Sequence, residues 1–100
     1  QDQAYLDHVL SVVSSERDRL TNRMTGLGLS VYPSAANFVL ARSAAPAQAL
    51  AAHLAAHDIM IQALPWPDKL GSIRVTVGIR EHNDAFLKAL EAFVRQPVVS

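Results

Sequence analysis

Apolar side chains recur every three or four positions through the first 28 residues of the chain, which predicts one long amphipathic helix. The members of this apolar stripe are Leu6, Val9, Leu10, Val13, Leu20, Met24 and Leu27. Arg17 falls where a further apolar side chain is due, so we expect its stem along the edge of the core and its guanidinium in water. Gly26 and Gly28 predict the end of the helix, because glycine adopts the left-handed conformation of a C-terminal cap.

The rest of the chain alternates short apolar runs with two further helical patterns. Strands are predicted at residues 29–32, 37–42, 59–64 and 72–78. Helices are predicted from about residue 46 to 57, where Pro46 suits the first turn, and from about residue 81 to 94. The run at 37–42 is apolar on both faces, which favours a central strand, whereas the short run at 59–64 favours an edge.

The order helix, strand, strand, helix, strand, strand, helix is typical of a small sheet covered by helices. We therefore expect an α/β domain of the α+β type. Its sheet would be largely antiparallel, with three to four strands and with helices packed on one face. Residues 1–100 are enough for a single domain, and half of them are apolar, which is sufficient for a core.

Composition and charge exclude several classes of partner. Nine basic residues balance nine acidic ones, whereas nucleic-acid binding draws on clustered positive charge. Phe38 is the one aromatic residue in a predicted central strand, which disfavours an RNA-binding sheet. There is no cysteine, and no apolar run approaches the roughly 20 residues that span a bilayer. We expect a cytoplasmic protein with no nucleic-acid or membrane partner.

Most residues with reactive side chains have an ordinary structural interpretation. His53 and His57 lie four apart on one predicted helix, but they lack the glutamate of a zinc-protease motif and a third ligand, so we expect no metal site. Ser34 has no nucleophile frame around it. The carboxylates form no obvious catalytic pair, and we expect most of them on helix surfaces or in loops. They are Asp7, Glu16, Asp18, Asp58, Asp68, Glu81, Asp84 and Glu91.

Arg74 allows two interpretations. Apolar residues alternate with polar ones from residue 73 to 77, which places Arg74 and Thr76 together on the polar face of a strand. On an edge strand, a lone arginine of this kind is normally solvated. However, Thr76 and Gly78 are small and leave room for a ligand, and the planar guanidinium pairs bidentately with a carboxylate or phosphate. Spacing alone leaves both interpretations open.

Several segments together resemble a known family. The segments are ERDRL, LGLSVYPSAANFVLAR, LAAHDIMIQ and GSIRVTVGIREHNDAFLKAL. In this order and spacing they resemble the C-terminal small domain of fold-type I, pyridoxal-phosphate-dependent aminotransferases, with histidinol-phosphate aminotransferases the nearest group. The matching pieces are Glu16-Arg17, Pro33-Ser34, Asn37-Phe38 and the stretch from Arg74 to Gly78. The resemblance covers roughly residues 4 to 94.

The resemblance implies that Arg74 binds the substrate's carboxylate or an equivalent anionic end. Gln62 stands where such enzymes usually carry a second arginine, and it is the other expected substrate-binding residue. Lys69 and Lys88 do not match the family's Schiff-base lysine. No catalytic or cofactor-binding residue is therefore expected in this chain. Pyridoxal 5'-phosphate would be bound by the large domain of a homodimeric parent enzyme, with an amino acid or an amino-phosphate as substrate, and the chain alone would be inactive.

Two alternatives stay open. Because Gln62 brings no charge, the parent enzyme could be a pyridoxal-phosphate enzyme for another amino acid, or a threonine-phosphate decarboxylase. The other alternative is a non-enzymatic ligand-sensing or interaction module, in which Arg74 is a surface charge.

Overall fold

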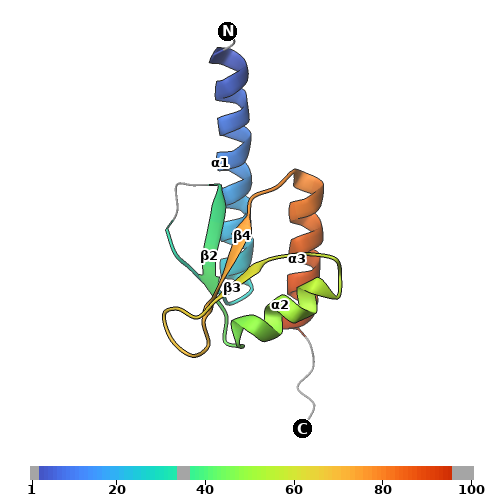
Figure 1. Cartoon of the computed structure of the whole chain (residues 1–100). Helices are drawn as coiled ribbons and strands as arrows, with labels where there is room; N and C mark the ends of the chain where they lie inside the picture. Colours follow the sequence, from blue (N-terminus) through green and yellow to red (C-terminus); the bar gives the residue numbers. More distant parts are fainter. Residues whose placement is uncertain (1–2, 34–36, 96–100) are drawn as a thin grey trace.

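The computed structural model of the chain describes residues 3–33 and 37–95, and Ser34 lies outside the described residues. Three helices and four strands follow one another in the predicted order (Figure 1). They are α1 (Gln3–Gly26), β1 (Ser30–Val31), β2 (Phe38–Arg42), α2 (Ala47–Ala55), β3 (Gln62–Leu64), β4 (Ser72–Thr76) and α3 (Arg80–Val94). The α+β prediction is confirmed, although β3 and β4 are shorter than expected.

The four strands form one antiparallel sheet in the order β1-β2-β4-β3. β2 is interior and β3 is an edge, as predicted. The expectation of an edge strand around Arg74 is wrong, because β4 pairs with β2 on one side and with β3 on the other. The alternation of apolar and polar residues at 73–77 shows that one face of the strand is exposed to solvent. It does not show whether the strand lacks a neighbouring strand on one side.

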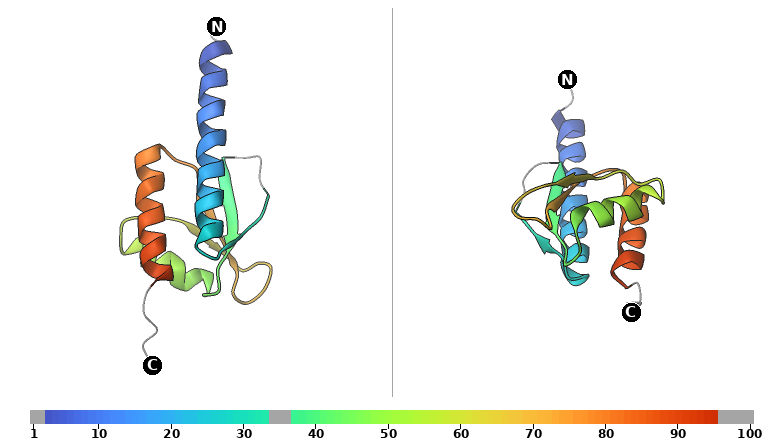
Figure 2. Two further views of the ribbon diagram at one scale, coloured as in Figure 1. Left: turned by 180° about the vertical axis from the view of Figure 1, so that it is seen from behind. Right: turned by 60° about the horizontal axis from the view of Figure 1, so that its bottom comes forward.

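Helices cover one face of this sheet (Figure 2). Residues facing the helices are almost fully buried, including Val39 and Ala41 from β2 and Ile73 and Val75 from β4. They meet the apolar side chains of all three helices in one core. The opposite face, which we call the open face, carries the alternate residues of the same strands. It therefore displays side chains from the centre of a rigid sheet.

Only the C-terminal half of α1 packs on the core. Leu20 and Met24 are fully buried, whereas Leu6 and Leu10 are about half exposed (49% and 58%). The N-terminal half extends past the end of the sheet (Figure 1). The helix ends as predicted: Gly28 takes a positive φ of 96°, and the Leu29 N–H donates to the Met24 carbonyl at 3.0 Å.

The loop from Pro65 to Gly71 lies against one end of the open face. The Trp66 ring packs on Tyr32 with centroids 5.3 Å apart, and Arg42 pairs with Asp68. Two polar atoms at this end, Arg42 Nε and Ser72 Oγ, are buried without a hydrogen-bond partner in the described part of the chain. The loop does not cover the part of the open face next to it, where Leu40, Arg74 and Gln62 lie side by side on adjacent strands.

Candidate functional site

Arg74 lies in the middle of the open face. Its cross-strand partners are Leu40 on β2 and Gln62 on β3, so both neighbours come from hydrogen-bonded strands. The side chain is exposed, while Ile73 and Val75 on either side of it point into the core. A central strand with a buried face fixes the base of this side chain, so the guanidinium reaches solvent from a rigid support.

The guanidinium of Arg74 lies over an aromatic ring. Its Cζ lies 4.4 Å from the centroid of the Phe38 ring, which is within the range of a cation–π contact. Phe38 pairs with Thr76 across the sheet, so it is the diagonal neighbour of Arg74 on the same face. The sequence indicated both side chains but not their contact.

Arg74 has no carboxylate partner among residues 3–33 and 37–95. Arginines that do form ion pairs in the same structure are Arg19, Arg42, Arg80 and Arg95. No carboxylate of the described residues therefore balances the positive charge of Arg74, and its exposed guanidinium keeps its N–H donors available. This arrangement suits an incoming anion, because a guanidinium binds carboxylate and phosphate with two parallel hydrogen bonds.

Gln62 and Arg74 share a shallow hollow. It has a volume of about 360 Å³ and is lined by Met60, Ile61, Gln62, Arg74 and Thr76. Gln62 is exposed and lies directly opposite Arg74 in the β3–β4 register. The structure thus brings together the two residues that the sequence analysis assigned to substrate binding. Gln62 supplies an amide that donates and accepts hydrogen bonds but adds no charge.

A second polar cluster holds the turn that follows β4. The Asn83 side chain accepts the Gly78 N–H at 2.9 Å and donates to the Gly78 carbonyl at 2.8 Å. It also donates to Glu16 Oε1 on α1 at 2.9 Å. Arg19 donates two hydrogen bonds to the same carboxylate, at 2.7 and 3.2 Å. We call Glu16, Arg19, Gly78 and Asn83 the turn brace, since together they tie α1, α3 and the end of β4.

Glu16 is an exception to the expectation that most carboxylates lie on helix surfaces or in loops. Its side chain is only 8% exposed, and Arg80 adds a longer ion pair at 3.5 Å. The hydrogen bonds from Arg19 and Asn83 lower the pKa of Glu16 from 4.5 to about 2, against the opposing effect of burial. The same contact raises the pKa of Arg19. Glu16 is therefore an ionised structural residue.

The sequence model of the family described as aminotransferase class I and II matches residues 1–90. The chain belongs to this family.

Curated relatives of this chain include proteins named histidinol-phosphate aminotransferase. The enzyme named histidinol-phosphate aminotransferase 2 of Thiobacillus denitrificans is 38% identical over 94 residues, covering 92% of this chain and 26% of the relative. The histidinol-phosphate aminotransferase of Roseiflexus castenholzii is 43% identical, covering 86% of this chain and 25% of the relative. The chain thus spans about a quarter of the length of the curated relatives it matches.

A solved structure gives the same picture. The histidinol-phosphate aminotransferase of Sinorhizobium meliloti, in complex with pyridoxal-5'-phosphate, superposes with a TM-score of 0.83 at 28% identity. The match covers 94% of this chain and 27% of that one. The family match and the curated relatives confirm the predicted family, and the superposition confirms the predicted fold class.

Both lysines of the chain lie away from the hollow beside Arg74. Lys69 in the Pro65–Gly71 loop and Lys88 on α3 are both exposed, and neither lines the hollow beside Arg74. A Schiff base needs a lysine at the reacting centre. The lining of the hollow beside Arg74 contains no lysine.

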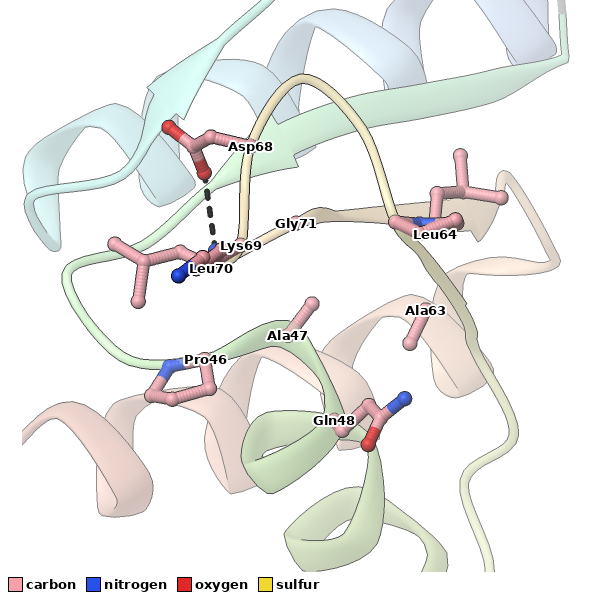
Figure 3. Close-up of a pocket in the computed structure, with 10 residues that line it drawn as sticks. Pro46, Ala47, Gln48, Ala63, Leu64, Asp68, Lys69, Leu70 and Gly71 are labelled. Atoms are coloured by element: carbon pink, nitrogen blue, oxygen red, sulfur yellow. Dashed lines mark hydrogen bonds between the residues drawn. The ribbon is translucent and has the colours of Figure 1, made fainter.

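A larger hollow than the one beside Arg74 lies elsewhere. It has a volume of about 660 Å³ and lies between the start of α2 and the Pro65–Gly71 loop (Figure 3). There the Asp68 carboxylate accepts the Leu70 N–H at 3.0 Å, and the Ala47 N–H donates to the Leu70 carbonyl at 2.7 Å. It shares no lining residue with the hollow at Arg74. Its polar groups are used to hold the loop, which is a structural role.

His53 on α2 likewise has structural contacts. His53 Nε2 lies 3.1 Å from the Ala89 carbonyl, and its ring packs on Phe93. Within the described ranges there is no group of three or more His, Asp or Glu side chains that could hold a metal ion. No helix there is both long and apolar enough to cross a membrane.

Proposed function

We propose that this chain is the substrate-binding C-terminal small domain of a pyridoxal-phosphate-dependent aminotransferase similar to histidinol-phosphate aminotransferases. In this role Arg74 anchors the anionic end of the substrate. The observation that carries the proposal is the unneutralised guanidinium at the centre of the open face, beside a hollow with no other charged lining residue. Family membership and the names of the relatives support the choice of reaction class.

The chemistry of such an anchor is orientation. A bidentate pair with a planar anion fixes the direction of the bound substrate as well as its position. Held in this way, the amino group of the substrate presents itself to a reacting centre in one pose, which removes part of the entropic barrier. Arg74 suits this task because its strand is central and its side chain is stacked, so the pose is defined before binding.

The remainder of the reaction depends on groups outside the described residues. Pyridoxal 5'-phosphate, when bound by the large domain of the parent protein, supplies the electron sink for transamination. This chain contributes substrate binding, and by itself it would be inactive. In the proposal the parent acts as a homodimer.

Gln62 favours a second candidate substrate. A phosphate monoester carries close to two negative charges, and Gln62 meets them with a neutral amide. A substrate with a single carboxylate needs only Arg74. The alternative is therefore a related pyridoxal-phosphate enzyme that acts on another amino acid.

The test is a pair of variants in the full-length protein that carries this chain. With L-histidinol phosphate as amino donor and 2-oxoglutarate as acceptor, we expect Arg74→Gln to lower kcat/KM at least about 30-fold, the cost of deleting one partner of a charge pair. Arg74→Lys should recover part of this loss, because it keeps the charge and loses the fork. Arg95→Gln is the control, since it removes an exposed ion pair on α3.

Two outcomes would contradict the proposal. If kcat/KM for Arg74→Gln stays within threefold of the parent, Arg74 is not the anchor. If the full-length protein acts on other amino acids but not on L-histidinol phosphate, the proposed substrate is wrong. The protein is then the related pyridoxal-phosphate enzyme for another amino acid, and Arg74 can still bind the carboxylate of that substrate.

A further inference from the structure

We propose that Phe38 is a positioning residue that holds the Arg74 guanidinium in its anion-binding orientation without neutralising it. This inference rests on the proposed function of Arg74 as the substrate anchor. It concerns a residue of the neighbouring strand that does not itself touch the substrate.

The geometry of the contact is set by the sheet. Phe38 is at the start of β2 and Arg74 is in the interior of β4, and the antiparallel register places them diagonally on the open face. Diagonal neighbours on one face are within reach of aromatic and long side chains. The ring centroid lies 4.4 Å from Arg74 Cζ, and the half-buried ring is supported by a strand in the middle of the sheet. The ring is thus a fixed surface under a long side chain that would otherwise sample many rotamers.

The two partners of Arg74 use different directions of the guanidinium. An aromatic ring attracts the cation through its face, whereas a carboxylate or phosphate takes the N–H groups that lie in the guanidinium plane. Stacking therefore leaves the hydrogen-bonding edge free. A carboxylate side chain in the position of Phe38 would hold Arg74 equally well, but it would occupy that edge and cancel the charge.

The same face offers this contrast in a second arginine. Arg42 on β2 is held by Asp68, a carboxylate, and is thereby neutralised. Arg74 is held by a ring and keeps its charge for a ligand. Restricting the side chain in advance lowers the conformational entropy that binding must remove, and this strengthens anion binding without adding a contact to the anion.

The experiment compares ring-conserving and ring-deleting variants in the full-length protein with its cofactor. Phe38→Leu removes the ring face and keeps an apolar side chain, and Phe38→Tyr keeps the face. We measure kcat and KM for L-histidinol phosphate, the inhibition constant of inorganic phosphate as a simple anion probe, and Tm. Leu40→Met on the same strand is the control for apolar repacking of this face.

For Phe38→Leu we expect KM and the phosphate inhibition constant to rise together by about two- to fivefold, the effect of one exposed cation–π contact, while kcat changes little. Phe38→Tyr should restore both values, and Leu40→Met should leave them unchanged. In an Arg74→Gln background, Phe38→Leu should have no further effect on either value, because the ring acts through the guanidinium.

Three results would overturn the inference. If Phe38→Leu leaves KM and the inhibition constant unchanged while Arg74→Gln raises both, the positioning role is wrong and the substrate anchor stands. If Phe38→Leu and Phe38→Tyr raise KM equally and lower Tm equally, the ring serves only packing. If Arg74→Gln changes neither constant, the proposed function is wrong and the positioning role falls with it.

Discussion

Replacing Glu16 with glutamine tests the turn brace most directly. Glutamine keeps the shape of the side chain and one acceptor oxygen, but it removes the negative charge. The substitution deletes the ion pair with Arg19 and places an amide N–H where Arg19 now donates. The hydrogen bond from Asn83 weakens as well, because its acceptor becomes neutral.

The size of the effect follows from the pKa of the carboxyl group. Lowering this pKa from 4.5 to about 2 corresponds to about 3 kcal/mol of native-state stability at neutral pH. Water screens part of this energy, because the side chains of Arg19 and Arg80 are 22% and 65% exposed. We therefore expect Glu16→Gln to lower the free energy of unfolding by about 2–3 kcal/mol at pH 7.

The same carboxyl group fixes the direction of the pH dependence. The pKa of Glu16 is lower in the folded chain than in the unfolded chain, so the unfolded chain takes up the proton first as the pH falls. The stabilisation is complete above pH 5 and is lost between about pH 5 and pH 2. The difference in the free energy of unfolding between the unsubstituted chain and Glu16→Gln should therefore decrease as the pH falls from about 5 to 2.

Urea unfolding followed by far-UV circular dichroism measures these differences at pH 7, 5 and 3. Glu91→Gln is the matched control, since its ion pair with Arg95 is exposed and should contribute less than about 1 kcal/mol. Equal stability of the parent chain and Glu16→Gln at pH 7 would falsify the reasoning. A loss that is the same at pH 7 and pH 3 would also refute it, because the effect would then come from packing instead of charge.

Two further substitutions test other parts of the structure. Gly71→Ala would place a Cβ against the Leu64 carbonyl oxygen at a φ of 75°, so we expect the free energy of unfolding in urea to fall by about 2 kcal/mol or more. Gly26→Ala is the control, because its Cβ meets no atom within 4 Å and the substitution should be neutral or stabilising. Unchanged stability of Gly71→Ala would contradict this. Gln62→Arg adds a second guanidinium opposite Arg74, so the KM for L-histidinol phosphate in the full-length protein should fall about tenfold. An unchanged KM would place the phosphate away from Gln62.

Local signals in the sequence were sufficient for the elements and their faces. Gly28 at the end of α1 and Pro46 at the start of α2 mark helix boundaries through their own backbone preferences. The alternation from Ile73 to Val77 located the buried face of β4, since successive side chains in a strand point to opposite sides. These features depend on near neighbours in the chain, and a single sequence contains them.

Pairing between distant segments was beyond these signals. Alternation reports which side of a strand is buried but not which strands lie beside it, so the central position of Arg74 was missed. Its contact with Phe38 depends on the register of β2 with β4, which the turn and loop lengths do not determine here. Gln62 was placed beside Arg74 through the family resemblance and not through spacing.

Glu16 shows a different kind of failure. It lies three residues after Val13 and four before Leu20, so it falls on the apolar stripe of α1 and could have been recognised as a buried residue. The sequence analysis gave that place to Arg17, whose long stem can lie along the edge of the core. Its partners are Arg19 on the next turn of α1 and Asn83, 67 residues further along the chain. A charge on an apolar stripe is therefore evidence of a distant polar partner.

The two arginines of the open face explain why this surface suits a ligand. Arg42 and Arg74 both project from interior strands, and each needs something that holds its long side chain in place. Asp68 holds Arg42 and balances its positive charge with a carboxylate. This ion pair lies at the end of the sheet that the Pro65–Gly71 loop covers. Phe38 holds Arg74 where the face is uncovered, and the charge survives. A strand that needed only structural support would be served by the first arrangement. The second keeps an ordered cation in water, which is the arrangement that the proposed function requires for binding an anion.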